Sequence, residues 1–432
     1  MALLVFFVAF VLAAAVPAIG QEGFLSIDCG RDATSSGYTD AVGIFYFPDG
    51  PYVDSGENQQ VLAKYVSRTL SRTSYTLRSF PTGGRNCYSL PTNSGAKYLV
   101  RLGFFYGNYD GKNSSSTLQF DLYLGVNYWD TMYAYLDNVY EAVFVAWASW
   151  APVCFINTGA GTPFVSTVEL RLLGTELYGN DIVTASQSMR MHMRRDMGPT
   201  NVYVTQYPHD PYDRFWWQIN DPSWANLSTT STIQTESKFK VPSTVLQKAI
   251  MPTGNNTVLS IMTWQDTTER EYAVFRHFAD FQNREPRQFD VYFDVNLAKE
   301  AFRPSYLTAS YVYTSSWFKA TDGNYNITLA ATNVSMLQPM LNALEIYSLI
   351  THHSTTTFFK DFDAIMAIKF EYGVKKNWMG DPCFPKEYAW DGVKCRNTSG
   401  NNARIVSLDL SNSNLRGVIS DNFTSLTALE NL

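Results

Sequence analysis

The chain carries the same strand-like motif twice, in two places far apart. The stretch FDLYLGVN at Phe120–Asn127 returns as FDVYFDVN at Phe289–Asn296. Two more pairs of motifs keep the same order around it: YLVRLGFF from Tyr98 with YAVFRHFA from Tyr272, and TPFVSTVEL from Thr162 with QPMLNALEI from Gln338. One shared octet can arise by chance between two strands, but three pairs in the same order indicate an internal duplication.

The duplicated segments have the period of β-strands. In TLQFDLYL (117–124), Leu, Phe, Leu and Leu alternate with Thr, Gln, Asp and Tyr, as in a strand with one buried face. Short strands of this kind, separated by Gly, Asn, Asp and Pro, favour β-sandwiches. We therefore expect a mainly β protein with one sandwich over 24–178, a connector or terminal strand at 179–199, and a second sandwich over 200–350. The equivalent positions are Phe120 with Phe289, and Glu169 with Glu345.

A helical period follows the second copy. In KDFDAIMAIKFEYG (360–373), apolar residues recur at helical spacing. Asp361 is placed to cap the first turn, and Gly373 lies where a glycine ends a helix. A short helix is therefore predicted within 355–374.

The first twenty residues, MALLVFFVAFVLAAAVPAIG, have the layout of a secretory signal peptide. They contain no charged side chain, and small residues at Ala18 and Gly20 suit a cleavage site. The alternative is a membrane anchor, but the apolar core ends near Val16 and is short for a bilayer. No later stretch approaches the roughly 20 apolar residues of a membrane span. The chain after removal of 1–20 is therefore expected to be secreted, with no membrane span.

Two further features agree with a secreted protein. Asn-x-Ser/Thr triplets accept glycans in that compartment, and they predict glycosylation at Asn113, Asn226, Asn255, Asn326, Asn333, Asn397 and Asn422. The net charge is −6, from 33 basic and 39 acidic residues. Nucleic acid and anionic membrane do not attract an acidic chain, so neither is expected as a partner.

The stretch GDPCFPKEYAWDGVKC holds two of the chain's five cysteines. Cys383 and Cys395 enclose a short ring that oxidising conditions would close as a disulfide. A ring of this kind, with Trp390 inside it, can cap the exposed end of a repeat array. The competing interpretation is a metal site, but two cysteines without a second pair or nearby histidines are a poor zinc set. We predict a disulfide cap over 377–403 and neither metal nor cofactor.

After the cap the sequence takes up a leucine-rich repeat pattern, with a serine at 413 in place of the usual asparagine. The pattern covers 404–432, as one repeat and the start of a second, and rests on Leu408, Leu410, Leu415, Gly417 and Ile419. A repeat buries its apolar face only against its neighbours. If no further repeats follow Leu432, amide exchange should be faster after Ser407 than in the strand at Phe120–Leu124.

These motifs together resemble the extracellular part of a plant malectin-like, leucine-rich-repeat receptor-like serine/threonine kinase. The resemblance implies two tandem malectin-like β-sandwiches, a repeat cap and repeats. Full-length members continue into a transmembrane helix and a kinase. The kinase motifs V-A-I-K, H-R-D and D-F-G do not occur here, so the chain as given is not expected to be an enzyme. The matching motifs are FLSIDCG (24–30), YVDSGEN (52–58), LRSFPTGGRNCY (77–88), YGNYDG (106–111), NTGAGTPF (157–164), YPHDPYDRFW (207–216) and NWMGDPC (377–383).

The remaining three cysteines lie in the first copy. We pair Cys29 with Cys87, although the two lie in separate motifs of that region, and leave Cys154 as a free thiol. Cys154 sits in the apolar stretch APVCFIN, which suits a buried thiol.

Aromatic residues supply the one hint of a binding site. Sugars pack on aromatic faces, and loops at the ends of sandwiches often bind ligands. FFYGNYDG offers Phe105, Tyr106, Tyr109 and Asp110 in one loop-like stretch. Animal malectin, a distant relative, binds glucosylated glycans with aromatic residues and an aspartate. The competing interpretation makes Phe105 and Tyr106 core residues of a strand, and we favour it for those two.

Two functional hypotheses follow. The first is a non-catalytic ectodomain of a receptor-like kinase, or a shortened secreted form of one. Its partners would be a cell-wall carbohydrate or a secreted peptide, together with a co-receptor ectodomain. The second is a free-standing secreted lectin or carbohydrate-active protein.

Overall fold

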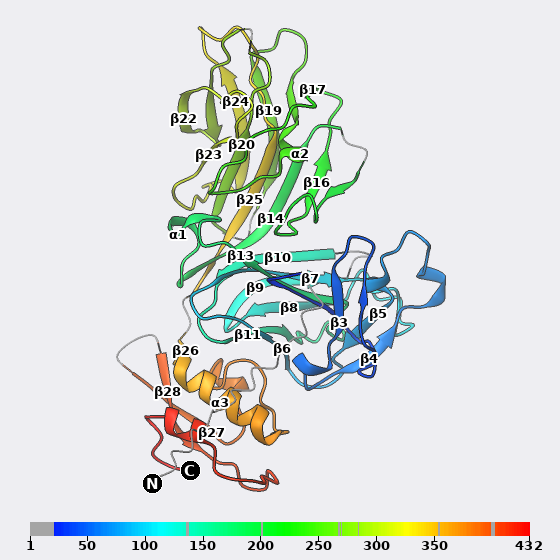
Figure 1. The fold of residues 1–432 in the computed structure, drawn as a ribbon, viewed down its shortest axis with the longest axis vertical. Helices are drawn as coiled ribbons and strands as arrows, with labels where there is room; N and C mark the ends of the chain where they lie inside the picture. Colours follow the sequence, from blue (N-terminus) through cyan, green and yellow to red (C-terminus); the bar gives the residue numbers. More distant parts are fainter. Residues whose placement is uncertain are drawn as a thin grey trace, which may run out of the picture.

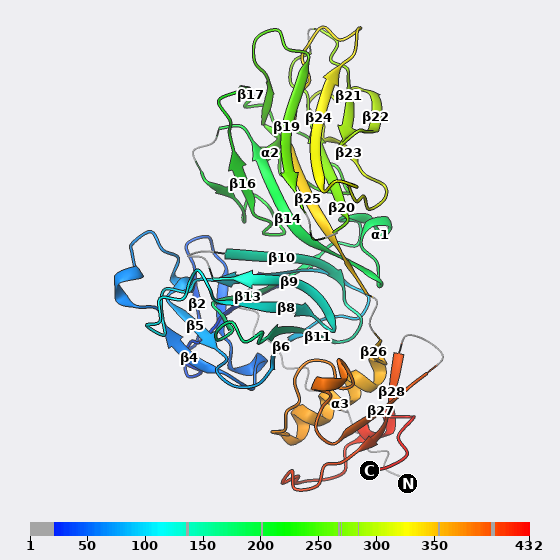
Figure 2. The same cartoon turned by 180° about the vertical axis from the view of Figure 1, so that it is seen from behind.

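The computed structural model describes residues 21–134, 138–199, 202–266, 268, 270–283, 285–352, 355–398 and 402–432. The predicted signal peptide, 1–20, lies outside the described residues. Three units succeed one another along the long axis (Figure 1). An N-terminal unit, coloured blue to cyan, lies in the centre, a green to yellow middle unit lies above it, and an orange to red C-terminal unit lies below. Figure 2 shows the same order from behind.

One large sheet runs through the N-terminal and middle units. Counting the described residues alone, it has twelve strands. Its path is β2 (Tyr38–Thr39), β3 (Phe45–Pro48), β1 (Phe24–Asp28), β13 (Thr167–Leu173), β7 (Lys97–Phe104), β10 (Asn138–Val145), β14 (Gln187–Met197), β25 (Ala343–Thr351), β20 (Tyr272–Phe278) and β23 (Ser310–Tyr313), with β16 (Trp216–Ile219) paired to β14 and β15 (Val204–Thr205) paired to β16. The prediction of a mainly β protein is confirmed.

In the N-terminal unit a second sheet covers one face of this path. Its order is β6 (Arg85–Pro91), β11 (Trp150–Ile156), β8 (Gln119–Leu124) and β9 (Asn127–Tyr133). Alternate residues of β8, namely Phe120, Leu122 and Leu124, are at most 1% exposed and belong to the core of the unit. The alternation in the sequence therefore marks the buried face of this strand, as predicted.

The middle unit is built in the same way. Its second sheet has the order β19 (Val258–Gln265), β24 (Asn324–Ala331), β21 (Phe289–Phe293) and β22 (Asn296–Phe302). Val274 and Phe278 of β20 share a core with Phe289 and Val291 of β21. The two layers of each unit thus face each other across an apolar interior, which is the largest source of stability available to such a sheet.

The duplicated motifs occupy corresponding strands with the same register. Strand β7 pairs antiparallel with β13 in the N-terminal unit, and β20 pairs antiparallel with β25 in the middle unit. Tyr98 lies opposite Leu172 in the first pair, and Tyr272 lies opposite Ser348 in the second. Residues 179–199, predicted as a connector or terminal strand, contain β14, which pairs with β10 on one side and with β25 on the other. This strand makes the two units continuous.

The C-terminal unit combines helix α3 (Phe359–Tyr372) with the sheet β26 (Thr356–Thr357), β28 (Asn402–Leu408) and β27 (Val393–Asn397). Helix α3 ends at Gly373 with φ +58°, as predicted. The prediction of Asp361 as its N-cap is wrong, because Phe358 takes that position. Asp361 lies inside the first turn, where its carboxylate accepts hydrogen bonds from Arg404 Nε and Ile405 N, both at 2.9 Å.

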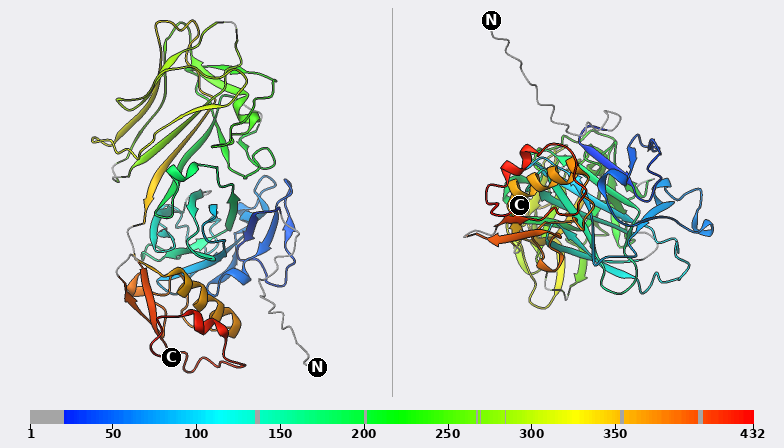
Figure 3. Two further views of the ribbon diagram at one scale, coloured as in Figure 1. Left: turned by 60° about the vertical axis from the view of Figure 1, so that its left-hand side comes forward. Right: turned by 90° about the horizontal axis from the view of Figure 1, so that it is seen from below.

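The core of the C-terminal unit contains the predicted disulfide. Cys383 and Cys395 are bonded, and Trp390 stacks on Trp378 with ring centroids 5.0 Å apart. Leu408 is buried in the same cluster. Figure 3 shows α3 packed beside the strands of this unit from two directions.

The remaining elements are short. They are the sheets β12 (Phe164–Val165), β5 (Thr76–Ser79) and β4 (Glu57–Gln60), and β17 (Trp224–Ser228) with β18 (Lys248–Pro252); the helices α1 (Gly179–Ile182) and α2 (Ser243–Leu246); and 3₁₀ turns at Gly50–Tyr52, Ala63–Tyr65, Arg72–Ser74, Lys386–Tyr388 and Asp421–Ser425. No helix among the described residues is both long and apolar enough to cross a membrane.

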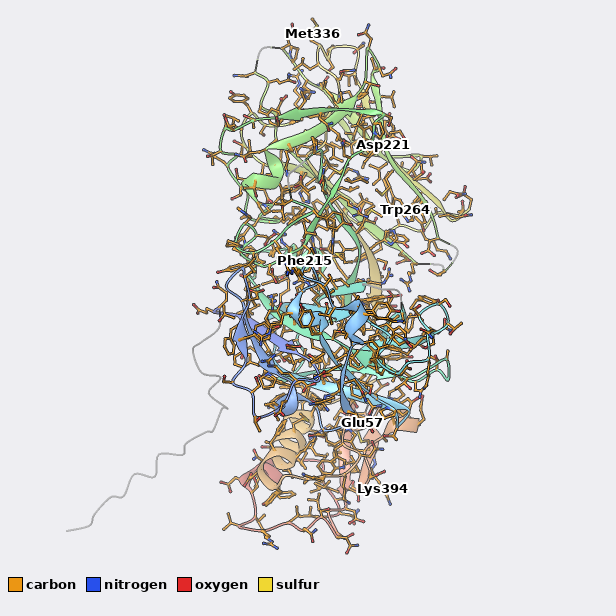
Figure 4. All side chains as sticks on the ribbon, turned by 90° about the vertical axis from the view of Figure 1, so that its right-hand side faces the viewer. Glu57, Phe215, Asp221, Trp264, Met336 and Lys394 are labelled. Carbon is orange, nitrogen blue, oxygen red and sulfur yellow. A yellow bond between two sulfur atoms is a disulfide. The ribbon has the colours of Figure 1, made fainter. Side chains whose placement is uncertain are left out.

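A buried network of charges lies where the N-terminal and middle units meet. Arg101 of β7 contacts Glu141 at 2.7 Å, Glu169 at 2.8 Å and Asp213 at 2.8 Å. The ring of Phe215 lies 3.4 Å from the Arg101 Cζ. Figure 4 places Phe215 at the level where the two units join, far from Met336 at the tip of the middle unit and from Lys394 in the C-terminal unit.

The network continues into the middle unit through Arg194 of β14. Its guanidinium contacts Glu141 at 2.8 Å and Glu345 at 3.0 Å. Burial raises the pKa of Glu345, but the hydrogen bond from His277 and the charge of Arg194 outweigh it and hold that pKa well below its usual range. Glu345 is therefore ionised, and one connected set of ion pairs holds both units.

A second contact between the units surrounds His192 of β14. Its ring packs against Trp264 and Tyr272, and the nearby charged groups are Arg190, Arg270, Asp266 and Asp130. Burial, followed by the charge of Arg190, lowers the pKa of His192 to about 4. The ring is therefore neutral in the folded protein at neutral pH.

This lowered pKa predicts sensitivity to acid. At pH 5 the unfolded chain binds a proton at His192 and the folded chain does not, so stability falls as the pH decreases from about 6.5 to about 4. His192→Phe keeps an aromatic ring at this position but cannot bind a proton. We expect this variant to reduce the acid-induced loss of stability by up to about 3 kcal/mol. Urea unfolding at pH 7.5 and pH 4.5 measures it. Exposed His209→Gln is the control, and an equal acid loss in wild type and His192→Phe would contradict the prediction.

The predicted pairing of Cys29 with Cys87 is wrong. Cys87 is bonded to Cys154 with an S–S distance of 2.07 Å, and Cys29 is a buried free thiol. Cys87 of β6 and Cys154 of β11 lie directly opposite each other on neighbouring antiparallel strands. Cys29 follows β1, which belongs to the other sheet. Burial raises the pKa of the Cys29 thiol well above its ordinary value, so this sulfur is a poor nucleophile.

Peptide mapping of the secreted protein without reduction tests this arrangement. We expect linked peptides containing Cys87 with Cys154 and Cys383 with Cys395. Cys29 should react with iodoacetamide only after unfolding, because its side chain is 0% exposed. A linked peptide containing Cys29, or labelling of Cys29 in the folded protein, would contradict the arrangement.

The asparagines of the predicted glycosylation triplets are accessible to different degrees. Asn113, Asn226, Asn255, Asn333 and Asn397 are exposed. Asn326 and Asn422 are half-buried, and each donates a side-chain hydrogen bond, to Asp294 and to Glu371 respectively. Glycosylation at the half-buried pair would break those bonds, so the five exposed asparagines are the better acceptors.

Candidate functional site

A pocket of about 180 Å³ lies where all three units approach one another. We call it the junction pocket. The N-terminal unit contributes the β8–β9 turn and Trp147, the segments flanking β14 and β25 contribute Ser186 and His352, and the C-terminal unit contributes residues of β26, α3 and β28. Its lining is Gly125, Val126, Asn127, Trp147, Pro152, Ala185, Ser186, His352, Thr356, Phe362, Asp381 and Asn402.

The wall from the N-terminal unit depends on a glycine. Gly125 has φ +63°, and a Cβ added there would lie 2.8 Å from two ring carbons of Trp147. Both the backbone conformation and the close contact exclude a larger residue. The tight turn lets the Trp147 ring lie against the strand connection and places Asn127 at the start of β9. An aromatic face and an amide are thereby brought to the same wall.

Asp381 fixes the wall from the C-terminal unit. Its carboxylate accepts hydrogen bonds from Thr357 N at 2.9 Å, Cys383 N at 2.8 Å and Phe384 N at 3.0 Å, and also from the Thr357 hydroxyl. Burial raises the pKa of Asp381, and these bonds oppose that rise. The aspartate of the GDPC motif therefore orders the chain around the disulfide.

His352 is held by both ring nitrogens. Nδ1 lies 3.1 Å from the carbonyl oxygen of Ala185, which can only accept, so Nδ1 carries the proton. Nε2 lies 2.8 Å from the Ser188 hydroxyl, which donates to it when the ring is neutral. The ring is thus fixed in orientation at the edge of the junction pocket.

Arg85 joins the C-terminal unit to the N-terminal unit beside this pocket. It is the first residue of β6, and its guanidinium donates to the carbonyl oxygens of Met379, Asp381, Phe384 and Tyr388 at 2.5–3.2 Å. None of the described carboxylates forms an ion pair with Arg85, and burial lowers the pKa of Arg85 to about 10. One arginine therefore orders four backbone groups of the predicted cap.

The chemistry of the junction pocket suits reversible binding. Trp147 and Phe362 offer aromatic surface, while the side-chain amides of Asn127 and Asn402 offer hydrogen bonds. Nowhere in the described ranges do three His, Cys, Asp or Glu residues gather in a way that would hold a metal ion. A small polar group with one apolar face, such as a sugar ring or a peptide side chain, matches this lining.

The predicted binding residues lie elsewhere, in the N-terminal unit. Phe105 and Tyr106 are 7% and 2% exposed and belong to its core. The Tyr106 hydroxyl donates to Asp110. The Tyr109 ring packs 5.6 Å from that of Phe164. The loop is folded on itself, and none of these residues lines the junction pocket.

Tyr109 and Asp110 remain a proposal. The Tyr109 hydroxyl is buried and has no hydrogen-bond partner among the described residues, and burial raises the pKa of Tyr109. Asp110 is half-buried and lies near the exposed Lys112 at 3.7 Å. Sequence reasoning missed the junction pocket because its residues come from segments hundreds of positions apart. The one local signal was Gly125, which follows the strand predicted at 117–124.

Comparisons with known proteins agree with this architecture. A family model described as "Malectin-like domain" matches residues 27–349. A putative leucine-rich repeat receptor-like serine/threonine-protein kinase of Arabidopsis thaliana is 36% identical over 428 residues, covering 95% of this chain and 48% of the relative. The kinase IOS1 of the same plant is 34% identical over 418 residues, covering 95% and 46%. The chain thus spans about half the length of the curated relatives it matches.

Solved structures show the same fold. The ANX2 ectodomain from Arabidopsis thaliana matches with a TM-score of 0.63 and 15% identity, covering 76% of this chain and 97% of that one. A chain in the structure of the plant peptide RALF23 in complex with FER and LLG2 matches with a TM-score of 0.61 and 16% identity, covering 76% and 96%. Because the family model spans most of the sequence and the fold agrees, the chain belongs to the malectin-like domain family.

Proposed function

We propose that this chain is the extracellular, ligand-binding and non-catalytic region of a plant receptor-like kinase. Its N-terminal and middle units would be tandem malectin-like domains, and its C-terminal unit the cap and first turns of a leucine-rich repeat array. The similarity to receptor-like kinases along nearly the whole chain supports this, as do two disulfides, which are typical of an oxidising compartment. A free-standing lectin is not favoured, because the matched relatives are receptor kinases.

The junction pocket is the observation that carries the ligand-binding role. It is lined by all three units, so an occupant would contact each of them and bias how they are held together. A secreted peptide with a co-receptor is one class of partner, supported by the neighbour structure of RALF23 with FER and LLG2. A cell-wall carbohydrate is the other, supported by the aromatic and amide lining.

Titration calorimetry on the secreted chain tests the proposal, with a synthetic RALF23-type peptide and with cello-oligosaccharides as probes. Binding of either should weaken at least tenfold in Asn127→Ala and in Asn402→Ala, because both amides line the pocket. Asn324→Ala, an exposed asparagine of the middle unit, is the matched control. Binding that is equal in all four proteins would place the ligand elsewhere, and no binding of either probe would refute both ligand classes.

A further inference from the structure

Most buried arginines of this protein are paired with carboxylates. Arg101 contacts Glu141 at 2.7 Å, and Arg171 contacts Glu169 at 2.7 Å. Arg194 and Arg214 likewise contact Glu141 and Asp210, each at 2.8 Å. This is the usual arrangement, because a buried cation without a counter-charge loses its hydration and gains nothing in return.

Arg276 differs from these four, and also from Arg85, whose guanidinium donates to four backbone carbonyl oxygens. Among the described residues, Arg276 has no carboxylate partner. It lies on β20 and is 0% exposed. Its Nε and Nη1 have no hydrogen-bond partner, and its Nη2 lies 3.5 Å from the carbonyl oxygen of Tyr292, a long contact. Burial lowers the pKa of Arg276 to about 9, and no neighbouring charge opposes that shift. The guanidinium remains charged at neutral pH and is uncompensated.

The side chain of Arg276 points into the interior of the middle unit. Val274 and Phe278 lie two residues away on the same face of β20, and both belong to the core between the two sheets. The Cζ of Arg276 lies 5.7 Å from the ring centroid of Phe293. The guanidinium therefore reaches across toward β21.

A pocket of about 330 Å³ lies next to it, at the open side of the middle unit. Strand β22 ends one sheet and β23 ends the other, and both lie on the same side of the unit in Figures 1 and 2. Phe293 lines this pocket as well as facing Arg276. The other lining residues are Asn296, Leu297, Ala298, Tyr313, Thr314, Ser315, Ser316 and Phe318.

We propose that Arg276 and this pocket form a subsite for a carboxylate. The planar guanidinium offers two parallel N–H donors, from Nε and Nη2, that match the two oxygens of a carboxylate. Nε lacks a partner, and Nη2 makes only the long contact to Tyr292. The polar side chains of Asn296, Thr314, Ser315 and Ser316 line the approach. Phe293 both lines the pocket and faces the guanidinium, so the proposal requires its ring to move when a carboxylate reaches Arg276. The carboxylate belongs to an acidic peptide residue or to an acidic sugar.

This subsite shares no residue with the junction pocket. Its failure would therefore leave the proposed function untouched, and the reverse also holds. The Arg276 subsite would make the protein selective for ligands that carry a negative charge.

Thermal unfolding of the full chain at pH 7 tests the proposal, with sodium acetate compared with sodium chloride at equal ionic strength. Wild type should gain about 2–4 °C in Tm with acetate, in a saturable way. Arg276→Met should start from a higher Tm, because it removes the uncompensated charge, and should show no difference between the two salts. Arg303→Met, which removes an exposed arginine of the same unit, should respond to acetate as wild type does.

Replacing acetate by N-acetylglutamate amide or by glucuronate distinguishes the two sources of the carboxylate. The source that saturates at the lower concentration is the one the subsite prefers, and either result supports the proposal. Equal Tm values for wild type in acetate and chloride would overturn it. So would a lower Tm for Arg276→Met than for wild type, because the arginine would then be stabilising the apo core.

Discussion

Replacing Arg101 by Met should lower the free energy of unfolding by about 3–5 kcal/mol. The guanidinium faces Glu141, Glu169 and Asp213 at 2.7–2.8 Å. Removing it leaves these three buried carboxylates without one of their positive partners. The free energy lost in this way exceeds what the methionine gains by packing. Because the network spans β7, β10, β13 and the 207–216 loop, we expect a single lowered transition in urea, seen equally by fluorescence and circular dichroism.

An exposed ion pair provides the control for this prediction. Arg396 and Glu430 are joined at 2.5 Å, but their side chains are 63% and 51% exposed. Solvent screens such a pair, so Arg396→Met should not measurably change stability. Equally small changes in stability for Arg101→Met and Arg396→Met would contradict the prediction. They would mean that water or structural relaxation compensates the buried carboxylates, so that the network does not determine stability.

The paired strands of the two sandwiches and the end of α3 were predictable because their signals lie in short stretches of sequence. The alternation around Phe120 marks a strand with one buried face, and the repeated octet marks its counterpart at Phe289. Gly373 likewise ends α3 through its own backbone conformation. These features depend on a few neighbouring residues, which the sequence presents together.

The features that were missed depend on register. Cys154 pairs with Cys87 because β11 and β6 bring them directly opposite each other, and nothing in the stretch APVCFIN reveals that alignment. Asp361 failed as an N-cap for a similar reason: its partner, Arg404, lies on β28, far along the chain. The buried ion pairs and both pockets belong to the same class, since each is assembled by tertiary packing alone.

The interpretation favoured for Phe105 and Tyr106 is confirmed in that both are core residues, although they follow β7 rather than lie in it. Phe105, Tyr106 and Tyr109 are aromatic and adjacent in sequence, as a binding loop would be. In the structure, Phe105 and Tyr106 complete the core and Tyr109 packs on Phe164. A chain this rich in aromatic residues uses most of them for packing, so adjacency in sequence was weak support for a site.

Replacing Arg85 by Met should loosen the segment around Cys383 where the C-terminal unit meets the N-terminal unit, while leaving both layers of the N-terminal unit folded. The variant deprives four carbonyl oxygens, those of Met379, Asp381, Phe384 and Tyr388, of their charged donor. Hydrogen bonds to charged groups contribute about 1.5–3 kcal/mol each and are not additive, so we expect a local loss of about 3 kcal/mol. Hydrogen exchange should show it as faster exchange of the Cys383 and Phe384 amides, with β8 unchanged.

Two further variants separate the hydrogen bonds of Arg85 from its charge. Arg85→Lys keeps the charge but replaces the planar fork with a single nitrogen, so its exchange rates should fall between those of wild type and Arg85→Met. Gly380→Ala should loosen the same segment from the other side, because Gly380 has φ +70° and an added Cβ would lie 2.8 Å from the Arg85 Cζ. If Arg85→Met leaves the exchange of Cys383 and Phe384 unchanged, then the disulfide and the Asp381 hydrogen bonds hold the cap without Arg85. The junction pocket would in that case keep its shape without Arg85, since the Ser149–Asp363 and Lys369–Asp54 contacts also join the C-terminal unit to the N-terminal unit.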